Sequence, residues 1–138
     1  MVFNDLGQGV LNNAYGGYNT SLFAYGQTGA GKSYSMIGYG KNKGIVPITC
    51  LELFNKIERG PQETPNIKYE VKFSMLEIYN EKVRDLLSKN NPKGGLAVRQ
   101  NPKLGLFYVG DLKKVAVGSY EEIERRIEEG NATRTGLI

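Results

Sequence analysis

Apolar side chains near the start of the chain recur at every fourth position, which is the spacing of one helix face. They are Val2, Leu6, Val10 and Ala14. The pattern predicts a helix that reaches Tyr15, where two glycines end it because glycine readily takes the left-handed conformation of a helix cap. The run that follows, residues 21–25, is largely apolar and aromatic, as expected of a buried strand.

Two further helices are predicted before the chain reaches Pro61. The first begins at Lys32 and breaks in the polar, glycine-rich stretch of residues 38–44. The second begins near Pro47, whose missing N–H costs nothing in a first helical turn, and ends at Gly60 and Pro61. Its apolar stripe consists of Ile48, Leu51, Phe54 and Ile57.

The hydrophobic period changes to two after residue 65. Apolar Tyr69, Val71, Phe73 and Met75 alternate with polar residues, and Leu76 and Ile78 then add apolar groups to the second face. This pattern predicts a strand that becomes buried on both sides. Asn80 is a typical helix cap, which predicts a short helix over residues 81–87, and residues 88–95 form a polar loop. The inner face of that helix would be Val83, Leu86 and Leu87.

The remaining residues predict a hairpin, a strand and a helix. Residues 96–109 turn around a stretch rich in asparagine, proline and glycine, and residues 115–117 form a brief strand. Ser119, with Glu122 three residues later, forms a capping box that opens a helix ending at Gly130. Its apolar stripe is Tyr120, Ile123 and Ile127. The alternation of strands and helices predicts a layered α/β domain without internal boundaries.

Composition narrows the function classes. The chain has 138 residues, a net charge of +4 and 40% hydrophobic residues, which is typical of a globular domain. It contains no histidine, so imidazole catalysis and histidine-ligated metals are excluded. The single cysteine, Cys50, excludes an internal disulfide and is interpreted as a packing residue. Neither a membrane-spanning apolar run nor a long basic run occurs, so we expect neither membrane insertion nor nucleic acid as a partner.

The pattern G-x-x-x-x-G-K-[ST] of phosphate-binding loops occurs once, between the expected buried strand and the first helix after it. It comprises Gly26, Gln27, Thr28, Gly29, Ala30, Gly31, Lys32 and Ser33. The glycines leave backbone amides accessible to a polyphosphate, and the start of the helix favours an anion. Lys32 is expected to reach the β- and γ-phosphates, and the Ser33 hydroxyl to ligate Mg²⁺. The alternative is a glycine-rich turn before a helix, with Lys32 simply solvated.

Two long segments resemble the kinesin motor domain. Residues 17–19 and 23–36, which contain the phosphate loop, are similar to the nucleotide signature of that family. Residues 77–87, Glu-Ile-Tyr-Asn-Glu-Lys-Val-Arg-Asp-Leu-Leu, resemble a second hallmark. Residues 130–135 look like the segment before the first nucleotide-sensing switch. The short loop of residues 38–44 and the lobe of residues 104–112 look most like the third kinesin family, the cargo transporters.

The resemblance implies a P-loop NTPase-type three-layer α/β domain with the kinesin motor fold. Residues 1–138 would be part of that domain, truncated at both ends. The implied function is an ATP-dependent microtubule motor that binds ATP or ADP with Mg²⁺, works in the cytoplasm on the cytoskeleton, and reaches cargo or adaptors through regions outside this chain. Lys32 and Ser33 would act in catalysis, and Tyr34 would stack on the adenine or else pack on the helix flank.

The resemblance also implies a partner surface. Residues 96–112 are similar to the microtubule-facing lobe of kinesins, so the basic residues of this region would contact acidic tubulin. They are Arg99, Lys103, Lys113 and Lys114. Gly110 departs from the family, in which many members carry a charged residue there. Alternatively, these side chains are simply solvated and need no partner.

Two other interpretations stay open. The chain is similar to kinesins but lacks their D-x-x-G second switch, since no glycine stands three positions after Asp5, Asp85 or Asp111. It could therefore be an unrelated, complete P-loop NTPase in which Asp111 ends an apolar strand and binds Mg²⁺ together with Ser33. It could also be a module that binds nucleotide or tubulin without turnover.

Overall fold

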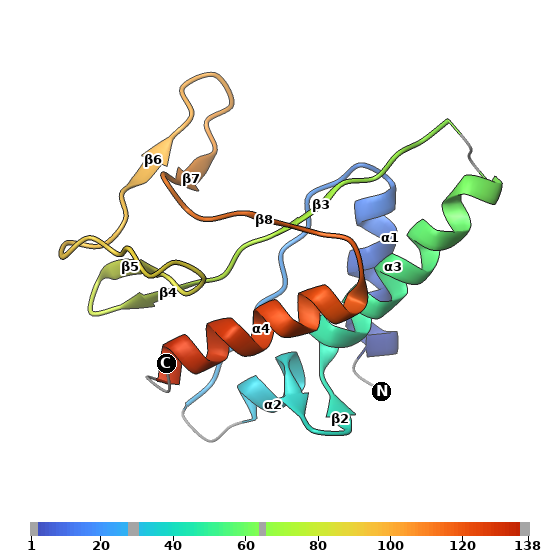
Figure 1. Cartoon of the computed structure of the whole chain (residues 1–138), viewed down its shortest axis with the longest axis horizontal. Coiled ribbons are helices and arrows are strands. Elements are labelled where there is room, and N and C mark those ends of the chain that lie inside the picture. Colours follow the sequence, from blue (N-terminus) through green and yellow to red (C-terminus); the bar gives the residue numbers. More distant parts are fainter. Residues whose placement is uncertain (1–2, 28–30, 64–65, 136–138) are drawn as a thin grey trace. The chain divides into compact units, whose positions relative to one another are not determined.

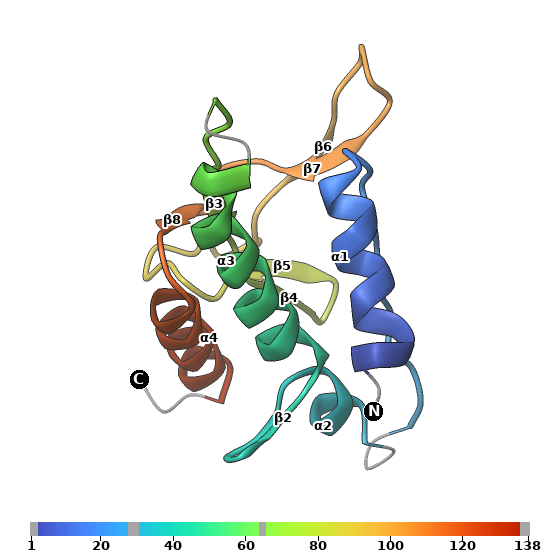
Figure 2. The same cartoon turned by 90° about the vertical axis from the view of Figure 1, so that its right-hand side faces the viewer.

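A computed structural model describes residues 3–27, 31–63 and 66–135. The chain forms two compact units, Met1–Tyr69 and Glu70–Ile138 (Figures 1 and 2). Within the described residues, every strand belongs to a two-stranded antiparallel sheet, and no larger sheet is formed. No helix in these residues has the length and apolarity needed to cross a membrane.

The first unit is mainly helical. In chain order its elements are η1 (Phe3–Gly7), α1 (Gln8–Tyr15), α2 (Lys32–Met36), β1 (Gly38–Tyr39), β2 (Asn42–Lys43) and α3 (Ile45–Glu63). The strands β1 and β2 form a small hairpin inside the stretch that the sequence identified as a polar loop. Helix α1 ends at Tyr15, as predicted, and Gly17 takes the left-handed conformation with φ of 86°.

The buried face of the first helical segment is not the predicted one. Phe3, Gly7 and Leu11 are buried, whereas Leu6 is 51% exposed. The reason is close packing against α3, because a Cβ at Gly7 would meet the Phe3 ring and the Thr49 hydroxyl of α3. Because Gly7 has no side chain, the backbone there can approach α3 closely, and this helix face is buried although Gly7 contributes no apolar side chain to it.

The expected buried strand at residues 21–25 is not formed. This segment has no regular secondary structure, and the side chains of Phe23 and Tyr25 are 82% and 94% exposed. Apolar and aromatic residues favour a strand only where a neighbouring strand supplies hydrogen bonds and packing. The described strands all pair elsewhere, so the prediction was wrong for this chain.

Helix α3 starts before Pro47, as predicted, but continues through Gly60 and Pro61 to Glu63. Proline in the last turn removes one main-chain hydrogen bond, which does not by itself end a helix that is already formed. Gly60 is buried, and a Cβ at this position would be in ordinary van der Waals contact with the Tyr69 ring. The predicted end was therefore one turn too early.

The second unit combines paired strands with one long helix. Its elements are β3 (Val71–Phe73), β4 (Leu76–Tyr79), β5 (Lys82–Asp85), β6 (Val98–Gln100), β7 (Phe107–Val109), β8 (Val115–Val117) and α4 (Tyr120–Thr135). Strand β3 pairs with β8, which comes after the lobe, and α4 packs against β8. The predicted long strand is thus divided at residues 74–75 into β3 and β4.

The short helix predicted over residues 81–87 is instead the second strand of a hairpin. Strands β4 and β5 pair antiparallel around Asn80 and Glu81, whose φ angles are 52° and 61°. Two consecutive positive φ values define the tight turn that matches the twist of paired strands. Asparagine favours that turn as well as a helix cap, and cross-strand pairing decides between the two.

The core of the second unit contains the apolar residues that the sequence selected. Val83, Leu86 and Leu87 are buried although the predicted helix around them is absent, and Ile123 and Ile127 of α4 join them. All five side chains are at most 7% exposed. Burial was therefore predicted better here than secondary structure was.

The capping box of α4 is confirmed. The Glu122 amide donates to Ser119 Oγ at 3.2 Å, and Glu122 Oε2 accepts from the Gly118 amide at 2.6 Å. The helix does not end at Gly130 but continues to Thr135. Gly130 is buried, and a Cβ there would meet the Met75 sulfur, so this glycine serves close packing rather than a helix end.

Candidate functional site: the phosphate loop and the basic lobe

The described part of the phosphate loop has the backbone that the motif requires. Gly26 and Gly31 have φ values of 146° and 88°, which side-chain-bearing residues rarely adopt. Gly31 caps α2, so Lys32 and Ser33 are the first two helical residues. Thr28, Gly29 and Ala30 lie outside the described residues. The sequence therefore placed the start of the helix and the flanking glycines correctly.

The side chain of Lys32 points back toward the first residue of the phosphate motif. Its Nζ donates a hydrogen bond of 2.6 Å to the carbonyl oxygen of Gly26, the first residue of the motif. The ammonium group thus lies at the loop instead of extending into solvent. Ser33 is exposed, and the Ile37 amide donates to its main-chain oxygen at 2.9 Å. The Lys32 ammonium group is a donor beside the first residue of the motif, which is compatible with a bound polyphosphate.

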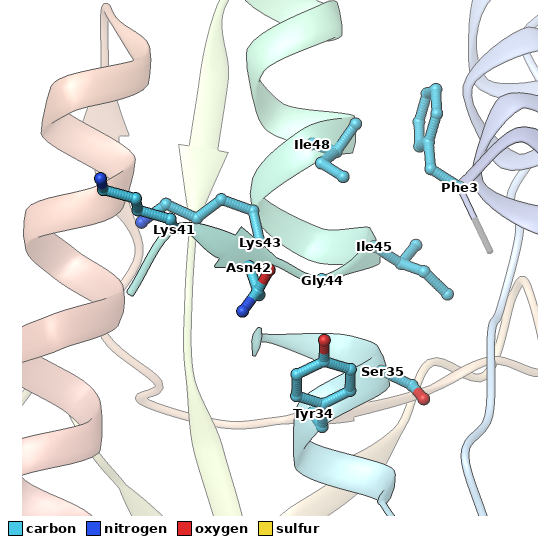
Figure 3. A pocket seen from close by; sticks show the side chains of 9 residues that line it. All are labelled: Phe3, Tyr34, Ser35, Lys41, Asn42, Lys43, Gly44, Ile45 and Ile48. Atoms are coloured by element: carbon cyan, nitrogen blue, oxygen red, sulfur yellow. The ribbon is translucent and has the colours of Figure 1, made fainter. Parts of the chain in front are cut away.

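Tyr34 lines a pocket in the first unit (Figure 3). Its ring is 52% exposed and lies 6.1 Å from the Tyr39 ring of β1, centroid to centroid. The pocket has a volume of about 380 Å³ and is lined by Phe3, Tyr34, Ser35, Lys41, Asn42, Lys43, Gly44, Ile45 and Ile48. In Figure 3, Lys41 and Lys43 extend away from Phe3 and Ile48. Apart from Tyr34, none of the lining residues was predicted as a site residue.

The basic residues predicted to contact a partner lie in the lobe of residues 96–112 or directly after it. Strands β6 and β7 form its stem, which closes where the Asn101 side chain accepts from the amides of Lys103 and Leu104. Arg99 lies on β6, and Lys103 lies in the turn. Lys113 and Lys114 follow the lobe before β8. All four side chains are exposed, as an electrostatic contact surface requires.

Asp111 does not lie in the setting that the alternative NTPase interpretation requires. It is an exposed turn residue with φ of 60°, directly after β7. That strand pairs antiparallel with β6, and the side chains of Phe107 and Tyr108 are 71% and 50% exposed. A Mg²⁺-binding aspartate of a P-loop enzyme would instead follow a buried parallel strand.

Comparison with known proteins identifies the family of this chain. The family model of the kinesin motor domain matches residues 1–136. Kinesin-related protein 1 of Dictyostelium discoideum is 55% identical over 136 residues, covering 97% of this chain and 6% of that protein. The kinesin-like protein KIF28 of Mus musculus is 53% identical over 133 residues, covering 96% of this chain and 12% of that protein. The chain thus spans a small part of these relatives.

Comparison with solved structures also identifies kinesin motor domains. A KIF14 dimer in the two-heads-bound state, with AMP-PNP and in complex with a microtubule, has a TM-score of 0.85 and 41% identity; the match covers 96% of this chain and 37% of that one. A fast kinesin has a TM-score of 0.87 and 34% identity, covering 97% of this chain and 37% of that one. The predicted kinesin motor fold is confirmed, and the chain belongs to the kinesin motor domain family.

Proposed function

We propose that this chain carries the phosphate-binding part of an ATP-driven microtubule motor. Family membership supports the motor assignment, and solved KIF14 structures contain a microtubule together with AMP-PNP or ADP. The observation that carries the proposal is the position of the Lys32 ammonium group over the loop that begins at Gly26.

Each residue of the loop has a role in this proposal. The amides of residues 26–33 surround the phosphates, and Lys32 exchanges its bond to Gly26 for one to a phosphate oxygen. The Ser33 hydroxyl ligates Mg²⁺, which neutralises charge on the phosphates when bound. Tyr34 borders the pocket of Figure 3 and offers an aromatic face to the adenine.

The test replaces Lys32 with alanine in the full-length protein. We expect microtubule-stimulated phosphate release to fall by roughly 10²-fold or more, because one charge-stabilising donor is removed from the transition state. Lys68→Ala is the matched control, since Lys68 is an exposed lysine outside the loop. Phosphate release by Lys32→Ala at the rate of the unaltered protein would contradict the proposal.

The basic lobe is proposed to contact tubulin through Arg99, Lys103, Lys113 and Lys114, whose exposed positive charges complement an acidic surface. A motor of this kind acts in the cytoplasm on microtubules, and its cargo or adaptors bind elsewhere on the protein. By itself, the 138-residue chain is proposed to bind nucleotide or tubulin without turnover.

A further inference from the structure

Asp85 at the end of β5 is the one buried charged side chain in the described part of the chain, with 1% exposure. Its carboxylate accepts hydrogen bonds from main-chain amides. The Leu87 amide donates to Oδ1 at 2.9 Å, and the Lys113 amide donates to Oδ2 at 2.7 Å. The second bond joins residues 28 positions apart, so it is a tertiary contact rather than a local turn.

Asn91 completes the arrangement from the other side. Its Oδ1 accepts from the Asp85 amide at 2.8 Å, and its Nδ2 donates to the Asp85 carbonyl at 2.9 Å. The same Nδ2 lies 3.2 Å from the Ser88 carbonyl. The side chain of Asn91 therefore fixes the path of residues 85–91, through which the chain leaves β5.

These contacts tie the segments before and after the basic lobe to β5. The lobe of residues 96–112 begins a few residues after Asn91 and ends directly before Lys113, and both of these residues contact Asp85. Near the entry, the Leu96 amide donates to the Val83 carbonyl at 2.8 Å. Gly95 packs so closely on Val83 that a Cβ would lie 2.9 Å from its backbone.

We propose that Asp85 is a positioning residue that sets the direction of the lobe and so presents Lys113 and Lys114 to an acidic partner surface. This inference rests on the proposed tubulin contact. A carboxylate suits the task because both oxygens accept, and two amides must be satisfied. Asparagine in its place would turn an N–H group toward one of these amides and leave that donor without an acceptor.

The experiment compares Asp85→Asn with Asp111→Asn in the full-length protein. Both changes remove one negative charge, but Asp111 is exposed in a turn and asparagine tolerates its positive φ. For Asp85→Asn we expect the microtubule concentration giving half-maximal ATPase to rise roughly 5- to 10-fold, the effect of losing two exposed ion pairs. The basal ATPase rate and the maximal rate should stay unchanged, as should all three quantities for Asp111→Asn. Equal half-maximal concentrations for Asp85→Asn and the unaltered protein would overturn the inference.

A double-mutant comparison separates positioning from a general loss of structure. Replacing Lys113 and Lys114 with alanine keeps the main-chain N–H of residue 113 and hence the bond to Asp85. If Asp85 acts through these lysines, their replacement raises the half-maximal concentration in the unaltered protein but adds little to Asp85→Asn. Fully additive effects would contradict the inference.

Amide hydrogen exchange on the unaltered protein tests the contact even if Asp85→Asn fails to fold. The Lys113 amide should exchange slowly, although the Lys113 side chain is exposed. Exchange as fast as in an unstructured peptide would overturn the inference while leaving the proposed function intact. Failure of the unaltered protein to bind microtubules would instead count against the proposed function.

Discussion

Single side chains decide which main-chain amides of this protein are satisfied and which remain open to a ligand. Asp85 accepts from two main-chain amides, and Ser119 accepts from the first turn of α4. In the described part of the phosphate loop, Gly31 caps α2 without a side-chain hydrogen bond. The same chemistry that stabilises α4 is thus left available at α2, where an anion is proposed to bind.

Cys50 permits a prediction at this scale. Burial raises the pKa of its thiol to about 11, because the thiolate is poorly solvated inside the protein. At pH 8 the thiolate fraction is then roughly 200-fold lower than that of an ordinary cysteine. We expect iodoacetamide to alkylate Cys50 correspondingly slowly, with a rate that rises as the pH approaches 11.

The same chain unfolded in urea is the control and should react at the ordinary rate. Since the folded pKa is raised, the stability that this thiol contributes is present below pH of about 8.5 and lost as the pH rises toward 11. Rapid alkylation of the folded chain at pH 8 would show that Cys50 is a reactive thiol and not a packing residue.

At the scale of elements, the same residues support different structures depending on what pairs with them. Asn80 favours both a helix cap and a tight turn. The buried residues Val83 and Asp85 alternate as in a strand, whereas the predicted helix face consisted of Val83, Leu86 and Leu87. Pairing with β4 selects the strand. The lobe hairpin was predicted correctly because its turn residues, with apolar residues on either side, favour a hairpin through contacts between residues close in the sequence.

The turn between β4 and β5 provides the second prediction. Glu81 has φ of 61°, which costs a residue with a side chain roughly 1–2 kcal/mol. Glycine avoids that cost but loses about 0.5–1 kcal/mol of backbone entropy. We therefore expect Glu81→Gly to raise the free energy of unfolding by roughly 0.5–1 kcal/mol, measured by urea denaturation.

Glu81→Ala is the matched variant, because it removes the same charge but keeps the strained backbone. It should change the free energy of unfolding by less than about 0.5 kcal/mol. If Ala and Gly stabilise equally, the gain comes from removing the carboxylate and the turn geometry is not its source.

The whole molecule consists of two compact units whose described strands form only two-stranded sheets. Its family is nevertheless that of the kinesin motor domain, with TM-scores of 0.85 and 0.87 to solved motors. The chain covers 6% and 12% of the first curated relatives, so the activity and partners of a complete motor are proposals for this chain.

We predict that the 138-residue chain alone binds ATP with Mg²⁺ but does not turn it over. Phosphoryl transfer needs groups that orient the attacking water and hold the metal in addition to the phosphate loop. Asp85 is 1% exposed and its carboxylate accepts from two main-chain amides, and no aspartate of the chain begins a D-x-x-G sequence. Calorimetry should detect binding, and steady-state phosphate release should stay at background. Appreciable hydrolysis would contradict the prediction, with Lys32→Ala as the control for contaminating ATPases.

The sequence by itself determined the features whose causes are local. The start of α2 at Lys32, the cap of α4 at Ser119 and the turn of the lobe depend on residues within a few positions of each other, and the sequence predicted all three correctly. The binding role of the phosphate motif stays a prediction. Only the tertiary structure decided which face of the first helix is buried, whether residues 21–25 pair and whether Asn80 caps a helix or turns a hairpin. It also brought Asp85 to the amide of Lys113. These outcomes depend on partners distant in the chain, whose approach no local spacing of apolar and polar residues specifies.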